Sequence, residues 1–445
     1  MTSSEDGSAG SADREADVST SGDRPGDEVF GPRLLGLLVG LLLLLGLVFG
    51  GYQSWRALEE PGPRGAIDLR NRFVETEAWF EGKKVYARYH DAMYPPASYA
   101  LLAPAIVPFK FPTARIVWFC FELLCVVAIV LALIHACGAR APNERRLWAF
   151  MVLGTYPLGA SIGNGQLGAP TLAALLGMAV LLGVSDTAQR VAWGRGVLAA
   201  CLLLVALAKP TLAAPFFWVL LVRGGWRAAV ACVLGYVALT FAASWPQDAG
   251  PIDLLRDWVR RAEIGARYGA SVGEGAIKVV TEGGGGGGGG GRSSGLRITH
   301  VNAHSLLSAF GLAKHGALVT LAALAALGAW IGVFRRAHLW VLIGSAGVVA
   351  RSMSYHAWYD DVVLILPLVA LWRLAKGLDH TSPALRRAAR LLFGLDLALL
   401  LAPGGIYALP RVPANIVAVT HALALLATLV LFAAVARRRE NDARA

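Results

Sequence analysis

Charged residues are scarce in this chain. Of its 445 residues, 16% are Asp, Glu, Lys or Arg, whereas about a quarter are charged in a typical soluble protein. Apolar residues make up 56% of the chain, and they come in long runs rather than in alternation. The clearest apolar runs are Leu34–Gly50, Ile116–Leu133, Gly196–Ala208 and Ala414–Ala436. Runs of about 17 to 25 residues match the thickness of a bilayer, and helices satisfy their own backbone groups in lipid. The sequence therefore predicts an all-α, polytopic membrane helix bundle.

Motifs of several other protein classes are absent. The five cysteines show no CxxC or Cys/His metal spacing, so we interpret them as packing residues. The glycine run Gly283–Gly291 lacks the Lys-Ser/Thr ending of a phosphate-binding loop. No positive region followed by a cleavage site precedes Leu34–Gly50, so this run is expected to be a retained anchor. The net charge of +11 comes largely from short Arg clusters between apolar runs, which are typical of cytoplasmic loops and do not indicate nucleic acid.

Composition divides the chain into three parts. Residues 1–33 are expected to form a disordered cytoplasmic tail, since their first 27 residues have almost no apolar content. Residues 34–436 form the predicted transmembrane domain, which contains a flexible glycine-rich loop at 269–294. Residues 437–445 form a second cytoplasmic tail, which begins with an Arg cluster.

The topology depends on one short apolar element, Pro95–Pro108. If it reaches only half-depth and returns to the outer face, the remaining basic clusters all fall inside, with about twelve crossings and both termini in the cytoplasm. If it crosses the membrane, the next few loops change sides, and their basic clusters no longer follow the rule that positive charges lie on the cytoplasmic side. We prefer the half-depth arrangement. The outer segment Tyr52–Tyr94 then carries apolar and charged residues in an amphipathic pattern, which predicts short helices on the membrane surface.

Ionisable groups at membrane depth cost about 2.5 to 3.5 kcal/mol and are functional candidates. Asp68 follows the first span in an Arg-rich stretch, where it is either a surface carboxylate paired with Arg70 or Arg72, or a general base at the rim of an outward cavity. Lys209 interrupts two apolar runs before Pro210. It either snorkels to the interface or binds a lipid-borne phosphate.

A third polar segment, Arg351–Asp361, combines a cation, a His, aromatic rings and two carboxylates between apolar runs. An interfacial aromatic belt accounts for its Trp and Tyr residues, but not for its ionisable ones. Two smaller signals are Tyr94–Pro96 and the turn Asn164–Gln166. Amides at such a turn line a polar cavity or cap helix ends, and the sequence leaves both alternatives open.

The order of these segments resembles a known family. A D-x-x-x-R step is followed by W-x-x-G, then by Tyr-Pro-Pro with an apolar run, by Gly-Gln, by Ala-Lys-Pro, by an x-x-S-L step and by a His/Tyr/Asp turn. In this chain the segments are Asp68–Arg72, Trp79–Gly82, Tyr94–Pro108, Gly165–Gln166, Ala208–Pro210, His304–Leu306 and His356–Asp361. The pattern, which spans about Leu34–Pro367, resembles the bacterial membrane glycosyltransferases of family 87. These have the GT-C architecture, and their best-known members are mannosyltransferases that use polyprenyl-phosphate-mannose.

The resemblance implies an inverting transfer of a sugar, mannose in the best-known members, from a polyprenyl-phosphate donor to a lipid or glycan acceptor. It also implies a multi-pass protein of the plasma membrane with its active site on the extracytoplasmic side. The general base maps to Asp68. The leaving phosphate needs cations around it, and the candidates are Lys209, Arg351, His356 and Arg72. The expected substrate contacts are Tyr94, Asn164, Gln166, His304, Tyr359 and Asp360. His304-Ser305 departs from the family pattern, in which Gln precedes the Ser.

No resident cofactor follows from this pattern. Some related architectures use a divalent cation, for which Asp360-Asp361 is the candidate. The alternative is an acid pair near Arg351. Two other functions remain open at this point. A secondary transporter also has about twelve spans, but usually shows a paired repeat, and no second copy of the Asp68–Pro108 block is visible. A lipid-carrier flippase or polymer ligase would share the lipid phosphate without needing Asp68.

Overall fold

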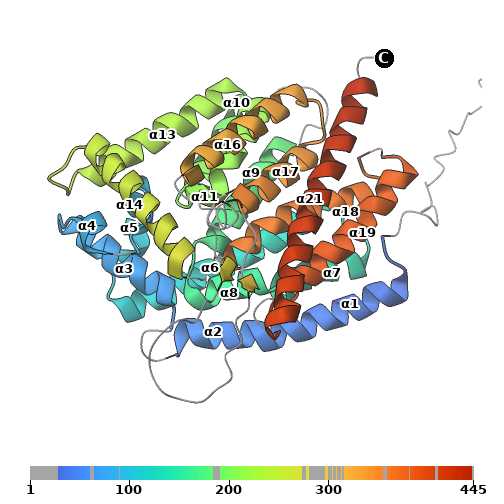
Figure 1. Ribbon diagram of the computed structural model, residues 1–445, viewed down its shortest axis with the longest axis horizontal. Helices are drawn as coiled ribbons and strands as arrows, with labels where there is room; N and C mark the ends of the chain where they lie inside the picture. The colour runs from blue at the N-terminus through green and yellow to red at the C-terminus, as the bar shows by residue number, and fades with distance from the viewer. Residues whose placement is uncertain are drawn as a thin grey trace, which may run out of the picture.

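The computed structural model is a bundle of helices (Figure 1), which confirms the all-α prediction. It describes residues 29–60, 65–89, 91–183, 191–272, 277–279, 296–298, 315–353, 358–379, 381–405 and 409–442, with Ala303, Leu307 and Leu312. The expected tails at residues 1–28 and 443–445, and the run Gly283–Gly291, lie outside the described residues.

The first half of the bundle contains a long first helix and a set of shorter ones. Its elements are α1 Pro32–Leu45, η1 Gly46–Gly50, α2 Gly51–Leu58, α3 Ile67–Phe80, α4 Val85–Arg88, α5 Pro96–Ile106, α6 Phe111–Ala136, α7 Pro142–Gly154, α8 Tyr156–Asn164 and α9 Gly168–Gly183. The anchor expected to end at Gly50 continues as one helix to Leu58. Gly46 and Gly154 let this helix cross α7 closely, because a Cβ on Gly154 would lie 2.7 Å from the Leu42 carbonyl oxygen.

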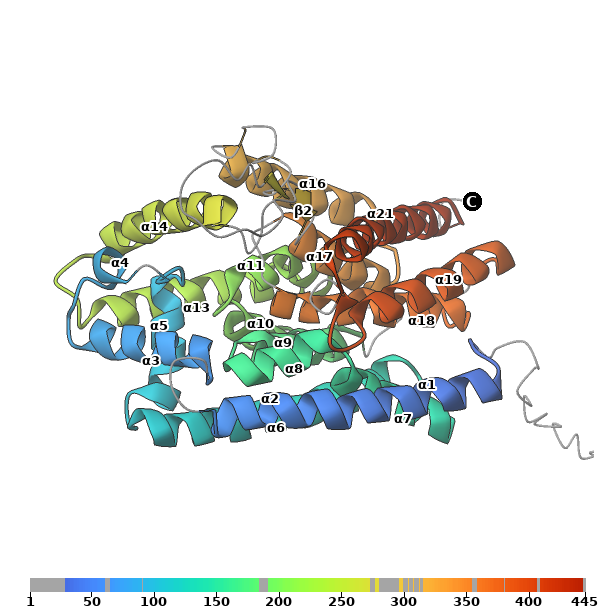
Figure 2. The same cartoon turned by 60° about the horizontal axis from the view of Figure 1, so that its bottom comes forward.

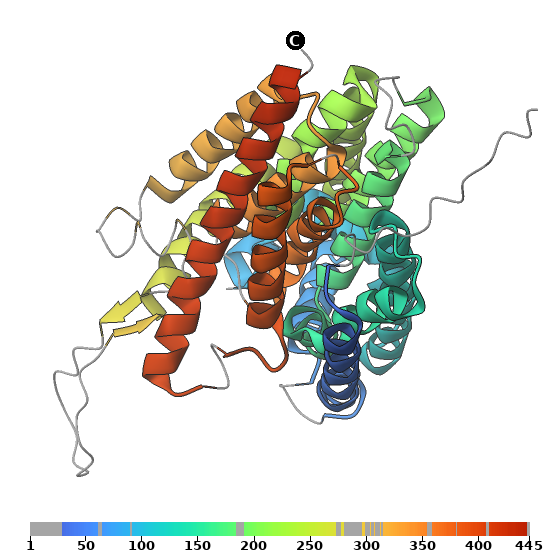
Figure 3. The same ribbon diagram turned by 90° about the vertical axis from the view of Figure 1, so that its right-hand side faces the viewer.

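The second half adds several broken helices and the long C-terminal helix, which runs along one side of the bundle (Figure 3). Its elements are α10 Trp193–Ala206, α11 Pro210–Ala213, η3 Ala214–Phe216, α12 Phe217–Val219, η4 Leu220–Gly224, α13 Trp226–Ser244, α14 Pro251–Val272, β1 Ile277–Val279, β2 Leu296–Ile298, α16 Gly316–Val333, α17 Leu339–Met353, η6 Trp358–Leu364, α18 Ile365–Ala375, α19 Pro383–Leu400 and α21 Arg411–Asp442. The antiparallel strands β1 and β2 lie on either side of the glycine run, and the described part of the expected loop 269–294 consists of the end of α14 and of β1.

Among the described helices, five are long and apolar enough to cross a membrane: Pro32–Leu58, Phe111–Ala136, Trp226–Ser244, Gly316–Val333 and Pro413–Asp442. Five shorter apolar helices accompany them. The long helices expose large apolar side chains, such as Leu37 at 73% and Leu234 at 62%, as expected where lipid replaces water. The chain is therefore a membrane protein. The expected total of about twelve crossings stays a prediction.

Helix α5 fills only part of the bilayer depth. It has 11 residues and contains Pro104, so its length is about 16 Å, roughly half of a hydrocarbon core of about 30 Å. This length favours the half-depth arrangement of Pro95–Pro108. At the same end of the bundle lie α3, α4 and α14 (Figure 2). The main core lies elsewhere, where Trp148, Trp372 and Phe393 pack their rings edge to face or tilted.

Candidate active site

Three polar side chains meet where helices break. Gln166 follows α8, which ends at Gly165 in the left-handed conformation with φ of +66°, a position that favours glycine. Lys209 lies between α10 and α11, directly before Pro210 at the first turn of α11. Asp360 lies in the short helix η6. All three residues lie at the ends of α-helices or outside them, and Lys209 contacts the side chains of both Gln166 and Asp360.

Lys209 is the cation of this cluster. Its ammonium group forms an ion pair with the Asp360 carboxylate and donates a hydrogen bond of 3.2 Å to Gln166 Oε1. Nζ also lies 5.0 Å from the centre of the Tyr359 ring. The Lys209 side chain is buried, with 7% of its surface exposed. Lys209 therefore does not snorkel to the interface, and the structure brings together three residues that the sequence singled out separately.

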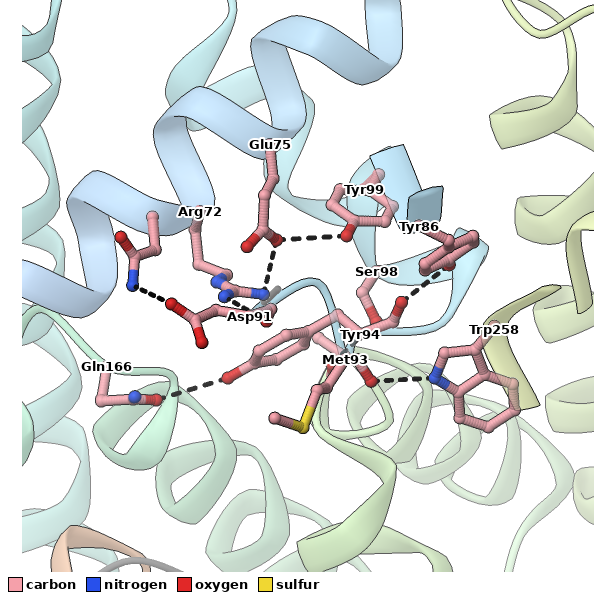
Figure 4. Close-up of polar contacts among 12 residues, drawn as sticks. Arg72, Glu75, Tyr86, Asp91, Met93, Tyr94, Ser98, Tyr99, Gln166 and Trp258 are labelled. Atoms are coloured by element: carbon pink, nitrogen blue, oxygen red, sulfur yellow. Dashed lines mark hydrogen bonds and ion pairs between the residues drawn. The ribbon is translucent and has the colours of Figure 1, made fainter. Parts of the chain in front are cut away.

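Gln166 connects this cation to Tyr94 and Asp68. The Tyr94 hydroxyl donates to Gln166 Oε1 at 3.3 Å (Figure 4), so that oxygen accepts from both Tyr94 and Lys209. The Gln166 side chain also faces the Asp68 carboxyl group, and this interaction lowers the pKa of Asp68. Since the amide oxygen is occupied by two donors, the amide N–H is the group that faces the Asp68 carboxylate.

Asp68 lies in the first turn of α3 and is partly buried. Burial raises the pKa of its carboxyl group above the ordinary value, while the hydrogen bond from Gln166 and the charges of Arg72 and Lys209 lower it, and the charge of Asp360 raises it. The net shift is upward. A carboxylate with a raised pKa is a better proton acceptor, and the charges of Lys209 and Asp360 act on the Asp68 carboxyl group.

Arg72 was expected near the donor phosphate, but its contacts are with protein groups. Its Nη1 lies 2.6 Å from Glu75 Oε2, and its Nη2 donates to the Asp91 carbonyl oxygen at 2.8 Å. The guanidinium also lies over the Tyr94 ring, 4.5 Å from its centre. Figure 4 shows these groups side by side. This geometry favours a role in holding Tyr94, and phosphate binding by Arg72 stays a prediction.

The acid pair Asp360-Asp361 divides between two cations. Asp360 pairs with Lys209, and Asp361 pairs with Arg351 of α17 and accepts a hydrogen bond from Tyr156. Asp361 is fully buried and Arg351 nearly so. In the described part of the chain, no group of three or more His, Cys, Asp or Glu residues is placed to hold a metal ion. The geometry favours the ion-pair alternative for these two carboxylates.

The remaining candidates fall into two groups. Asn164 accepts a hydrogen bond of 3.0 Å from Arg56 of α2, so in the structure it joins α8 to the first helix rather than the Lys209 cluster. His304 and His356 lie outside the described residues, and their expected contacts with acceptor and phosphate stay predictions.

Sequence reasoning missed Glu75 and Tyr99. Glu75 is 1% exposed, and the Tyr99 hydroxyl donates to its Oε2 at 3.2 Å. A signal was available, since Asp68, Arg72 and Glu75 follow one another at spacings of four and three and so share one face of a helix. A further buried carboxylate is Glu122 of α6, which lies within the apolar run Ile116–Leu133 and is fully buried.

Comparison with known proteins indicates the protein family. A family model described as glycosyltransferase family 87 matches residues 92–281. This match supports a family 87 glycosyltransferase. No curated protein and no solved structure matches it. The matched segment includes Tyr94, Gln166 and Lys209, whereas Asp68 and Asp360 lie outside it. The resemblance inferred from the motifs is thereby confirmed, and a sugar-transfer enzyme takes precedence over the transporter and flippase alternatives.

Proposed function

We propose that this family 87 glycosyltransferase moves a sugar, with mannose as the expected one, from a polyprenyl-phosphate donor to a lipid or glycan hydroxyl. The reaction takes place at the extracytoplasmic face of the plasma membrane. Family membership and the membrane helices support a sugar donor, an acceptor and a lipid environment. The choice of a lipid-phosphate donor rests on the sequence resemblance and on the buried cation Lys209 beside the half-depth helix α5.

Asp68 is the proposed general base. An acceptor hydroxyl is a poor nucleophile, and it loses its proton to a carboxylate as it attacks the anomeric carbon. A new bond forms between the acceptor oxygen and that carbon, the bond to the phosphate oxygen breaks, and polyprenyl phosphate leaves with the electron pair. A single displacement of this kind inverts the anomeric configuration. The raised pKa of Asp68 suits this role.

Lys209 is the proposed partner of the leaving phosphate. A lysine ammonium has three N–H donors, and the contacts that we describe direct two of them to Gln166 and Asp360. The third is the group that a phosphate oxygen would take. A buried cation stabilises the growing negative charge on the leaving group more strongly than a solvated one. Asp360 and Gln166 keep the ammonium in place for it.

One observation carries this proposal: the side chain of Gln166 accepts a hydrogen bond from Lys209 and also faces the carboxyl group of Asp68. The distance from a base to the leaving phosphate must match a sugar, and the shared neighbour Gln166 keeps the carboxylate and the ammonium group at one site. A carboxylate and a cation separated by the width of the bundle could not act on one glycosyl phosphate.

The donor class is tested with purified protein. Given a polyprenyl-phosphate sugar and a lipid acceptor, it should release polyprenyl phosphate in equal amount to the glycosylated acceptor. The same sugar supplied as a nucleotide sugar should give no product. Transfer from the nucleotide sugar, with none from the lipid-linked donor, would contradict the proposal.

A further inference from the structure

The helix face that carries Asp68 also carries a buried ion pair with no assigned role. Glu75 and Arg72 lie one turn apart on α3, with Nη1 and Oε2 2.6 Å apart. Glu75 is 1% exposed and Arg72 7%. Burying two charges costs desolvation free energy, and an apolar pair of the same size is often as stable. The pair is therefore expected to have a role that an apolar pair could not fill.

The pair is connected to the catalytic cluster through Tyr94. The Arg72 guanidinium covers the Tyr94 ring, 4.5 Å from its centre, and the Tyr94 hydroxyl donates to Gln166 Oε1. Gln166 in turn contacts Asp68 and Lys209. Figure 4 shows Glu75, Arg72, Tyr94 and Gln166 following one another in this order.

The Tyr94 segment is also held at its backbone. The Asp91 carbonyl accepts from Arg72 at 2.8 Å, the Met93 carbonyl accepts from Trp258 of α14 at 2.8 Å, and the Tyr94 carbonyl accepts from Tyr86 of α4 at 2.8 Å. Trp258 and Tyr86 hold the backbone from the side of α14 and α4, so Arg72 is the contact that reaches both the backbone of this segment and the Tyr94 ring.

We propose that Glu75 is a positioning residue of the transfer reaction: its carboxylate holds Arg72 against Tyr94 and thereby fixes the Gln166 amide that orients Asp68. This inference rests on the proposed role of Asp68 as the base. Glu75 itself touches neither the substrate nor Lys209. Its partner on the other side is the Tyr99 hydroxyl of α5, which donates to the same carboxylate oxygen at 3.2 Å.

The pair should respond to pH. Burial raises the pKa of Glu75 to about 7, while Arg72 and the Tyr99 hydrogen bond lower it and the charges of Asp91 and Asp68 raise it. Tyr86 of α4 also faces this carboxylate. As the pH falls through about 7, Glu75 becomes neutral and its attraction for Arg72 weakens. The rate should therefore fall on the acidic side as Glu75 and Asp68 both take up protons.

The test compares Glu75→Gln with Glu77→Gln, which lies two residues further on the exposed face of α3. Transfer from a polyprenyl-phosphate sugar is measured for each protein from pH 5.5 to 9. We expect Glu75→Gln to lower kcat by about 10- to 100-fold above pH 7, to leave the KM of the donor within about twofold, and to remove the fall in kcat that protonation of Glu75 causes near pH 7. Glu77→Gln should behave as the wild type.

The inference is overturned if Glu75→Gln and Glu77→Gln give the same profile, or if Glu75→Gln loses activity and still shows the fall in kcat near pH 7. A wild-type protein that does not use the lipid-linked donor would instead refute the proposed function. Where Glu75→Gln does not fold, Tyr99→Phe replaces it. Because the Tyr99 hydrogen bond lowers the pKa of Glu75, its loss should move the acidic limb to higher pH, and an unmoved limb would also overturn the inference.

Discussion

Two buried ionic clusters lie near opposite ends of α6. Near its beginning, where Arg115 donates to the Arg56 carbonyl and Phe111 packs on Phe73, lies the cluster of Asp68, Gln166, Lys209 and Asp360. Near its end, the Ala136 carbonyl accepts from Arg373 at 2.6 Å. A length of 26 residues separates these ends by about 39 Å.

The two clusters use charge differently. At the far end, Lys376 donates to both oxygens of Glu144 at 2.7 and 2.9 Å, and Asp379 pairs with Arg373 at 2.9 Å. These pairs connect the ends of α6, α7 and α18, and they bond carbonyls that helix ends leave open. Near Asp68, side chains instead converge on one amide at breaks in the helices. We therefore take the convergence of side chains at helix breaks, rather than buried charge by itself, as the feature that marks the candidate active site of this chain.

Asp68→Asn should give the largest effect in either cluster. Asparagine keeps the shape but accepts no proton from the acceptor hydroxyl, so kcat should fall by about 10²- to 10⁴-fold. Transfer is measured with the purified protein, and thermal unfolding in detergent checks the fold. The control is Asp253→Asn on the exposed surface of α14. Full activity in Asp68→Asn would remove Asp68 from the role of base.

Lys209→Met should cost about 10²- to 10³-fold in kcat. Because it also leaves Asp360 buried beside an apolar side chain, the fold is protected by a second change, Asp360→Asn. The double variant should recover thermal stability but not transfer. If the double variant recovered both, the Lys209–Asp360 pair would be structural, like the pairs at the far end of α6.

Gln166→Leu should lower kcat by about tenfold or more, since it removes the group that places Asp68 relative to Lys209. Leucine has a similar size, so the helix junction at Gly165 should persist. Steady-state rates and donor KM values measure the effect. An unchanged kcat would show that Asp68 and Lys209 hold their positions without the shared amide.

Lys376→Met should leave transfer nearly unchanged and affect only stability. The pair is partly buried, with side-chain exposures of 14% and 10%, so its loss should destabilise the protein by about 1 to 3 kcal/mol. We expect the unfolding temperature to be lowered, and kcat measured at temperatures below unfolding to equal that of the wild type. A large loss of kcat without any change in unfolding temperature would place this second cluster in the catalytic machinery.

Most residues of the candidate site could be singled out from the sequence. Asp68, Lys209, Gln166 and Asp360 each interrupt apolar sequence or sit beside Gly or Pro, and in lipid such positions are costly enough to need a reason. Their contacts could not be predicted. Lys209 meets Asp360 only because the fold brings the junction between α10 and α11 next to η6, which lies about 150 residues further along the chain.

The role of Arg72 shows where the prediction stopped. As a cation near Asp68 it was a reasonable phosphate ligand, but its partner Glu75 is stabilised by Tyr99, which a separate helix supplies. Asn164 likewise met Arg56 across more than a hundred residues. The helical fold follows from composition, because apolar runs fold as helices in a bilayer. Side-chain pairings depend on how those helices pack, which one sequence does not show.

The most direct test of the account is the anomeric configuration of the product. The wild-type enzyme is given an α- or β-linked polyprenyl-phosphate sugar of known configuration, and the new glycosidic bond is assigned by NMR from its anomeric coupling. A single displacement assisted by Asp68 as base predicts inversion. Retention of configuration would require a covalent or otherwise two-step route, and would contradict the role proposed for Asp68.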